Sequence, residues 1–115
     1  MKYILLIYGN EAGMLSASKE TAGQMIAAYT AYTEAMKKAG VYVGSDRLRP
    51  TSAASTVRVA DGKTQVLDGP YAETKEQLGG YYMVDVPDLD AALSWASRCP
   101  GAAHGTMEVR PIWVM

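Results

Sequence analysis

The chain has 115 residues, of which 49% are hydrophobic and 20% charged, a composition that fits one globular domain spanning residues 1–115. Its net charge of −1 argues against partners such as nucleic acid or an anionic membrane surface, and no apolar run approaches the roughly 20 residues of a transmembrane helix. The single cysteine, Cys99, cannot form an internal disulfide, which indicates a reducing, cytoplasmic environment.

The first third of the chain predicts a strand followed by a helix. Tyr3–Tyr8 is short, apolar and bounded by a Gly-Asn pair, which favours a buried strand. A loop from Gly9 then leads to Ser18, the expected N-cap of the helix, and Gly40 is its expected end. The residues at helical spacing between them are Ala22, Met25, Ile26, Tyr29, Thr33 and Met36.

The middle of the chain predicts a second strand and a β-hairpin. Val41–Gly44 alternates as a strand, and Ser45–Ser55 is expected to be an extended connection. Thr56–Ala60 and Lys63–Asp68 then flank Asp61-Gly62, a two-residue turn that favours a hairpin and determines its register.

That register predicts the surroundings of Asp68, our candidate catalytic residue. Ser55 is expected opposite Asp68, on a ribbon face that also holds Val57, Val59 and Val66. A carboxylate on an apolar face needs polar partners. Two interpretations follow: Asp68 accepts backbone N–H groups of the turn that it begins, or it serves as a general acid or base.

The stretch from Asp68 to Gly80, Asp-Gly-Pro-Tyr-Ala-Glu-Thr-Lys-Glu-Gln-Leu-Gly-Gly, is our candidate functional loop, and we call it the motif loop. Its charged residues Glu73, Lys75 and Glu76 either bind a polar ligand or form a solvated face. A capping-box pattern from Thr74 onwards also predicts a short helical turn.

The last third predicts a strand, a helix and a strand. Gly79-Gly80 is expected to turn the chain tightly into a strand that ends at Val86. Asp88 should cap a helix that ends at Cys99-Pro100, with Leu89, Ala92, Leu93 and Ala96 as its buried stripe. After a loop containing His104, Thr106–Val114 alternates as a half-exposed strand that includes Trp113.

This order of elements predicts an α+β fold of the ferredoxin-like, split β-α-β type with an inserted β-hairpin. Two helices can cover only one face of such a sheet. The simplest cover for the other face is a second copy, which predicts a C2 homodimer with a cleft between sheets and helices. One histidine and one cysteine offer no metal-ligand spacing, and no phosphate-binding loop is present, so we expect neither a metal nor a cofactor.

The sequence resembles the YCII-related family and, within it, the branch named after a DGPF motif. The likeness is carried by Met1–Tyr8, Thr56–Val59, Asp68–Tyr82, Asp88–Ala96 and Glu108–Pro111. Tyr71 stands where the branch name has phenylalanine, a change that keeps the ring and adds a hydroxyl. The resemblance implies a dimeric α+β barrel of ferredoxin-like subunits. It also implies a bacterial cytoplasmic protein from a branch often encoded beside extracytoplasmic-function sigma factors.

The resemblance also suggests a type of chemistry. Enzymatic members of the wider family resemble dehydrochlorinases or muconolactone-type isomerases, which use a histidine of the first helix and an aspartate near the second strand. Here Tyr29 and Tyr32 share one face of that helix, where they either pack in the core with their hydroxyls at the rim or line a pocket. Asp46 is the nearest candidate for the aspartate. Tyrosine, with an ordinary pKa of about 10, is a poor base at neutral pH but a good hydrogen-bond donor.

Three hypotheses about function follow. In the first, a small organic molecule binds in a cleft and undergoes proton-transfer, lyase or isomerase chemistry; the lining would be Asp68, Glu73, Tyr29, Tyr32 and Asp46, with Tyr71 and Lys75 from the loop. In the second, the chain is a non-catalytic accessory or sensory module whose motif loop contacts a protein such as a sigma factor. In the third, the loop crosses the dimer interface and locks the two subunits together.

Overall fold

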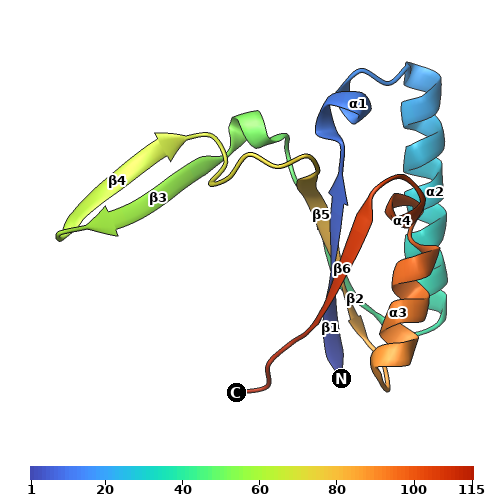
Figure 1. Ribbon diagram of the computed structural model, residues 1–115. Helices are drawn as coiled ribbons and strands as arrows, with labels where there is room; N and C mark the ends of the chain where they lie inside the picture. Colours follow the sequence, from blue (N-terminus) through green and yellow to red (C-terminus); the bar gives the residue numbers. More distant parts are fainter.

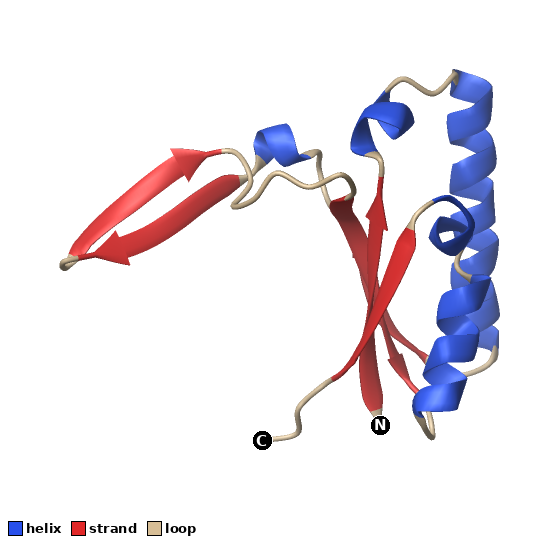
Figure 2. Ribbon diagram, in the orientation of Figure 1, coloured by secondary structure: helices blue, strands red, loops and turns tan.

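The computed structural model describes residues 1–115 and shows a four-stranded antiparallel sheet with its helices on one face and a β-ribbon standing apart (Figure 1). The fold is the expected α+β arrangement, and Figure 2 shows the helical and sheet layers. The elements are β1 (Lys2–Gly9), α1 (Glu11–Leu15), α2 (Lys19–Lys38), β2 (Tyr42–Arg47), a 3₁₀ turn η1 (Thr51–Ala53), β3 (Ser55–Ala60), β4 (Lys63–Asp68), β5 (Gln77–Asp85), α3 (Leu89–Arg98), α4 (Pro100–His104) and β6 (Thr106–Pro111).

Strand β1 lies in the centre of the sheet, whose order is β2-β5-β1-β6. It pairs antiparallel with β5 on one side and with β6 on the other. Strand β2 pairs antiparallel with β5, so β1 and β2 run in the same direction with β5 between them. This is the split β-α-β arrangement that the order of the elements predicted. No helix of the chain is both long and apolar enough to cross a membrane.

The core lies between the sheet and helices α2 and α3. Leu5, Met36 and Val84 are its fully buried large side chains, one each from β1, α2 and β5. Helix α3 contributes only the small residues Ala92 and Ala96, which allow its backbone to approach the sheet closely. The predicted stripe on α3 is therefore partly wrong, because Leu89 and Leu93 lie on its flank and remain exposed.

Three predicted connections contain structure that the sequence patterns did not indicate. The loop after Gly9 holds α1, because the Asn10 side chain accepts a hydrogen bond from the Gly13 N–H and caps a short helix. The loop containing His104 is the short helix α4, which has Pro100 at its first turn. Strand β2 extends into the predicted connection because its residues up to Arg47 pair with β5.

The final strand is shorter than predicted, and the chain then leaves the sheet. Register pairing between β1 and β6 ends where Tyr3 faces Pro111, and one more backbone hydrogen bond follows it, from the Ile112 N–H to the Lys2 carbonyl at 2.8 Å. Trp113, expected within this strand, lies beyond its end and is 88% exposed.

The predicted hairpin is confirmed in register but forms a separate arm, here defined as Ser55–Asp68. Val57 faces Val66 and Ser55 faces Asp68, as counted from the turn. The turn has positive φ at both central residues, 51° at Asp61 and 73° at Gly62, as the tightest hairpins require. Figure 1 shows the arm projecting from the end of the sheet, on the side away from the helices.

Gly79 and Gly80 lie inside β5 rather than in a turn before it, which corrects their predicted role. At Gly80 the backbone of β2 passes so close that a Cβ atom would lie 2.8 Å from the Asp46 carbonyl oxygen. At Gly79 the nearest atom would lie at 3.9 Å, an ordinary contact. Gly80 is therefore the glycine that this strand pairing requires.

We expect Gly80→Ala to lower the free energy of unfolding by about 1–3 kcal/mol, because backbone atoms of β2 must move to admit the methyl group. Gly79→Ala, one residue away on the same strand, is the matched control and should change it by less than about 0.5 kcal/mol. Urea denaturation monitored by circular dichroism measures both. If both variants lost the same free energy of unfolding, the close approach of β2 would not be the reason that Gly80 must be a glycine.

Candidate functional site

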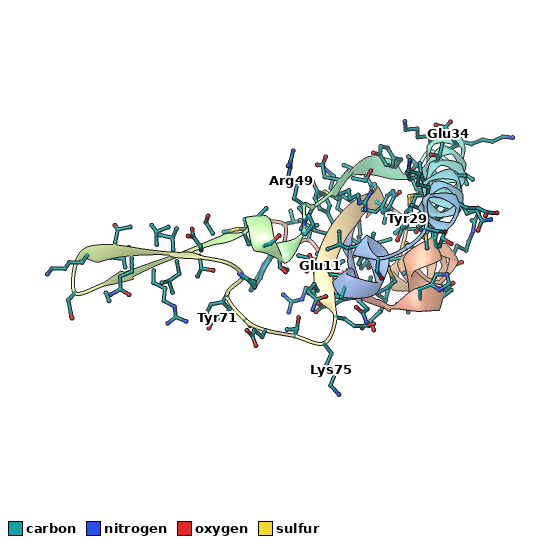
Figure 3. All side chains as sticks on the ribbon, turned by 90° about the horizontal axis from the view of Figure 1, so that it is seen from above. Glu11, Tyr29, Glu34, Arg49, Tyr71 and Lys75 are labelled. Atoms are coloured by element: carbon teal, nitrogen blue, oxygen red, sulfur yellow. The ribbon has the colours of Figure 1, made fainter.

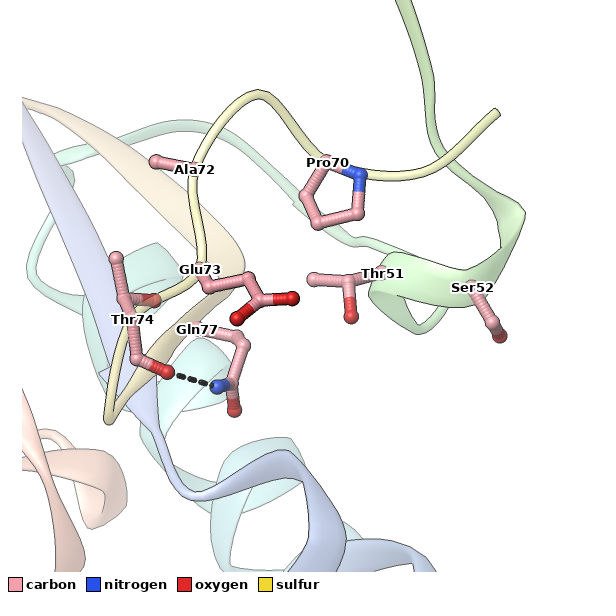
Figure 4. A pocket seen from close by; sticks show the side chains of 7 residues that line it. All are labelled: Thr51, Ser52, Pro70, Ala72, Glu73, Thr74 and Gln77. Carbon is pink, nitrogen blue, oxygen red and sulfur yellow. Dashed lines mark hydrogen bonds between the residues drawn. The ribbon is translucent and has the colours of Figure 1, made fainter. Parts of the chain in front are cut away.

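A cleft opens beside the motif loop, where the arm joins the sheet. A cavity of about 410 Å³ lies between η1, the motif loop and the start of β5. Figure 4 shows its lining, which consists of Thr51, Ser52, Pro70, Ala72, Glu73, Thr74 and Gln77. A second hollow of about 310 Å³ shares five of these residues and adds Tyr8, Tyr71 and Leu78. We call the two hollows together the motif-loop cleft.

The two hollows of the cleft differ in chemistry. The first is polar, and Figure 4 shows the Glu73 carboxylate directed into it, near Thr51 and Gln77. Glu73 is exposed, and its carboxylate takes part in none of the chain's hydrogen bonds or ion pairs. The second hollow has two aromatic rings and a leucine on its wall. One ligand spanning both would meet a carboxylate at one end and rings at the other.

Glu11 holds η1 against the rest of the cleft. Its carboxylate accepts hydrogen bonds from the backbone N–H of Thr51 and, at 2.6 Å, from the Thr51 hydroxyl. Its own backbone N–H donates to Oε1 of Gln77 at 2.9 Å. Glu11 thus joins α1, η1 and β5 at one point. Sequence analysis missed it, because its partners lie 40 and 66 residues away and leave no local pattern.

The second half of the motif loop is fastened by side chains and not by a helical turn, so the predicted capping box is wrong. Nε2 of Gln77 donates to the Thr74 carbonyl at 2.7 Å, which begins β5 where the helix was expected. The Glu76 carboxylate accepts the Thr106 hydroxyl at 2.6 Å. Glu76 is therefore a structural link to β6, which leaves Glu73 as the acid that faces the cleft.

Asp68 lies at the entrance to the motif loop, exposed at the end of β4. The turn behind it is closed by the Gly69 N–H, which donates to the Ala54 carbonyl at 2.7 Å, and by the Thr56 hydroxyl, which donates to the Gly69 carbonyl. None of the turn's N–H groups binds the Asp68 carboxylate, so its interpretation as a turn cap is wrong. Its ribbon face is apolar as predicted but uncovered in the single chain.

Tyr71 contacts the rest of the protein, whereas Lys75 points away from it. The Tyr71 ring lies 5.0 Å from the Arg58 guanidinium, a cation–π contact that ties the loop to the arm, and it also lines the second hollow. Figure 3 shows Lys75 at the outer bend of the loop, pointing away from the body of the protein.

Tyr29 and Tyr32 belong to the core and not to the cleft. The Tyr32 hydroxyl donates to the Trp95 carbonyl at 2.6 Å, and its ring meets Tyr82 edge-on at 5.1 Å. Tyr29 stacks on the other side of Tyr82. Burial raises the pKa of Tyr29 and of Tyr32, so both remain protonated at neutral pH.

Asp46 lies on β2, at the edge of the sheet face opposite the helices. It accepts the Tyr81 hydroxyl at 2.8 Å, and this hydrogen bond raises the pKa of Tyr81. Of the seven expected site residues, the single chain brings only Tyr71 and Glu73 into one cleft. The expectation that one cavity would gather all seven is not met, because α2 directs its tyrosines inward and the Asp46 carboxylate is bound to Tyr81 on the sheet.

The family model for the YCII-related domain matches residues 1–115. The chain belongs to the YCII-related family.

This YCII-related chain is 40% identical over 114 residues to the protein R00369 of Rhizobium meliloti (strain 1021), described as uncharacterised, and the match covers 97% of the chain and 92% of the relative. In structure it is similar to 5-chloro-2-hydroxyhydroquinone dehydrochlorinase (TftG) from Burkholderia phenoliruptrix AC1100, solved in complex with 2,5-dihydroxybenzoquinone. That match has a TM-score of 0.56 and 13% identity, and it covers 98% of this chain and 94% of the other. At this identity the likeness establishes a shared fold.

We expect Glu11→Gln to loosen η1, because an amide keeps one acceptor oxygen but loses the charge that strengthens both bonds from Thr51. The loss of about 1–2 kcal/mol should speed amide exchange around Thr51 by roughly tenfold or more. Hydrogen exchange with mass spectrometry measures this locally. Glu34→Gln, an exposed acid on α2 remote from the cleft, is the control. Unchanged exchange at Thr51 would mean that Glu11 does not hold the turn.

Alkaline pH should lower the free energy of unfolding of this YCII-related protein. Burial raises the pKa of Tyr29, Tyr32, Tyr82 and the Cys99 thiol in the folded chain. In the unfolded chain these groups lose their protons near their ordinary pKa values. Their contribution to stability is therefore fully present below about pH 9, and it is lost progressively as the pH rises above that value. Urea midpoints between about pH 7 and about pH 10.5 measure the fall. A flat profile would contradict the burial of these groups.

Proposed function

We propose that this protein, a member of the DGPF-motif branch of the YCII-related family, binds a small hydroxylated ring compound in the motif-loop cleft. The observation that carries the proposal is the Glu73 carboxylate, which faces a cavity and has no partner in the chain, beside a hollow walled by Tyr8 and Tyr71. An unpaired acid at the wall of a cavity favours a ligand with hydrogen-bond donors. Aromatic walls favour a flat ring.

Two further observations support this ligand class. The volumes of the two hollows are in the range of small-molecule sites, which run from roughly 300 to 1,000 Å³. The structurally similar dehydrochlorinase TftG was solved with 2,5-dihydroxybenzoquinone, a flat ring with two hydroxyl groups. A ring hydroxyl of this kind would donate to Glu73 while the ring lies against Tyr71.

The reaction class that we propose is proton transfer, as in lyases and isomerases of small acids and rings. Glu73 would bind a ligand hydroxyl. Asp68 lines neither hollow but lies two residues before Pro70, which lines both, and it would exchange a proton with a ligand at that end of the cleft. Asp68 is free for this role because its turn does not use its oxygens. Tyr29 and Tyr32 would act only as core residues that support α2.

We also propose that the working form is a homodimer formed through the open sheet face, defined as the side of the sheet opposite the helices. Its central residues are Ile4, Leu6, Tyr8, Tyr81 and Met83. The chain exposes 8233 Å², about 2,100 Å² more than the roughly 6,100 Å² expected of a compact monomer of its mass. An excess of that size is within one subunit's share of an obligate dimer interface, and the open sheet face would supply part of it.

The test is a thermal-shift screen of the purified protein against a panel of dihydroxybenzenes, hydroxyquinones and hydroxylated aromatic acids. A true ligand at about 100 times its Kd should raise Tm by roughly 10 °C. Glu73→Gln should weaken its binding at least about tenfold, because the charge-assisted hydrogen bond is lost. Glu20→Gln, an exposed acid on the first turn of α2, should bind as the wild type does.

Asp68→Asn separates binding from chemistry. It should leave the Kd of the ligand within about twofold of the wild-type value while abolishing any conversion of that ligand. Chromatography of the reaction mixture measures the conversion. If no hydroxylated ring stabilises the wild type, or if Glu73→Gln binds one as tightly as the wild type does, the proposed ligand class is wrong.

A further inference from the structure

The arm has one apolar face and one polar face. Val57, Val59 and Val66 share a face, on which Val57 and Val66 are directly paired across the strands. These three valines are 60%, 68% and 61% exposed. The opposite face carries Arg58, Lys63 and Gln65, with Leu67 at its base. The arm is thus amphipathic, although no part of its own chain covers its apolar face.

A free two-stranded ribbon is at best marginally stable in water, and this one also exposes three valines on one face. The chain as a whole is also less compact than its length implies. Its radius of gyration is 16.1 Å, against about 13 Å for a compact domain of this size. Both observations indicate that the arm folds against something outside the chain.

The position of the arm indicates what that is. Figure 1 shows it extending from the end of the sheet on the side of the open sheet face. A second sheet packed on that face would lie about 10 Å away, whereas six-residue strands reach about 20 Å. An arm of this length would extend past the sheet of a second copy and alongside the helices behind that sheet. A body seated on the open sheet face therefore comes within reach of the valines.

The geometry points to a second copy of this chain as the partner of the arm, and we propose that the valine face of each arm packs on the other subunit. The inference rests on the homodimer proposed above and adds a second contact to it. A standard interface buries about 800 Å² on each side, so the open sheet face alone leaves much of the 2,100 Å² excess uncovered. In a C2 dimer both arms are buried at once, which doubles the gain.

This contact would make the motif-loop cleft depend on the partner. The arm and the motif loop are joined by the Gly69 N–H to Ala54 carbonyl bond, by the Thr56 hydroxyl to Gly69 carbonyl bond, and by the Arg58 guanidinium over the Tyr71 ring. Docking the arm fixes these anchors, and Tyr71 lines the second hollow. Each cleft is then shaped by the subunit that holds its arm.

The first test replaces the valine pair by residues of equal shape, in the double variant Val57→Thr with Val66→Thr. Threonine keeps the strand propensity, so the change removes apolar surface without unravelling the ribbon. Light scattering over a dilution series should show the dimer dissociation constant rise about 100-fold, because four valines are lost from each dimer. The matched control is Lys63→Thr with Gln65→Thr, two residues of β4 on the opposite face of the arm. Its dimer should dissociate as the wild-type dimer does.

The second test keeps the wild-type interface. A benzophenone side chain is placed at Val59 in one chain and at Gln65 in another, and each protein is irradiated. The Val59 position should yield a covalent product of twice the chain mass, and the Gln65 position much less. This result also decides the question if the double threonine variant does not fold.

The proposal is overturned if the double threonine variant dissociates as the wild type does, or if the Val59 probe reacts only within its own chain. It is overturned in part if that variant is monomeric yet binds the ring ligand with an unchanged Kd, because the cleft would then not depend on the partner. A wild-type dimer that passes both arm tests but binds no hydroxylated ring leaves the arm inference standing and refutes only the proposed ligand.

Discussion

The structure depends on the double pairing of β1, which hydrogen-bonds to β5 on one side and β6 on the other. Successive side chains of this strand point to opposite faces of the sheet, and the two faces differ in how well they are covered. Tyr3 and Leu5 point toward the helices and are buried, whereas Ile4 and Leu6 point the other way and are only partly covered. A fully apolar strand is typical of a sheet buried on both faces, and here the chain supplies cover for one.

Local chemistry made much of the fold predictable. Ser18 and Asp88 cap their helices as expected, since each side chain accepts a hydrogen bond from a backbone N–H three residues on. Asp61-Gly62 determined the hairpin register, because few other residue pairs adopt positive φ twice in succession. The packing of α3 was less predictable, because a helical stripe does not reveal that the helix will approach through its alanines and leave Leu89 and Leu93 on its flank.

The site was less predictable than the fold, for a physical reason. The sequence indicated the motif loop and two of the residues that line its cleft, Tyr71 and Glu73. It did not indicate Glu11 or Thr51, which meet only because β1 and β2 lead their following segments to the same end of the sheet. For Tyr29 and Tyr32 the sequence left core packing and pocket lining open, and the structure shows core packing, because Tyr32 is buried with its hydroxyl on the Trp95 carbonyl and Tyr29 packs against the core.

The arm described above also has two open edges, since β3 and β4 pair only with each other. Every ribbon edge of this kind exposes backbone N–H and C=O groups to which another chain can add a strand, the first step of aggregation. The charged residues Arg58, Asp61 and Lys63 lie toward the far end of the arm, and charged side chains on an open edge disfavour strand addition. The same ribbon that presents valines on its face thus carries, at its tip, charged residues that limit strand addition at its edges.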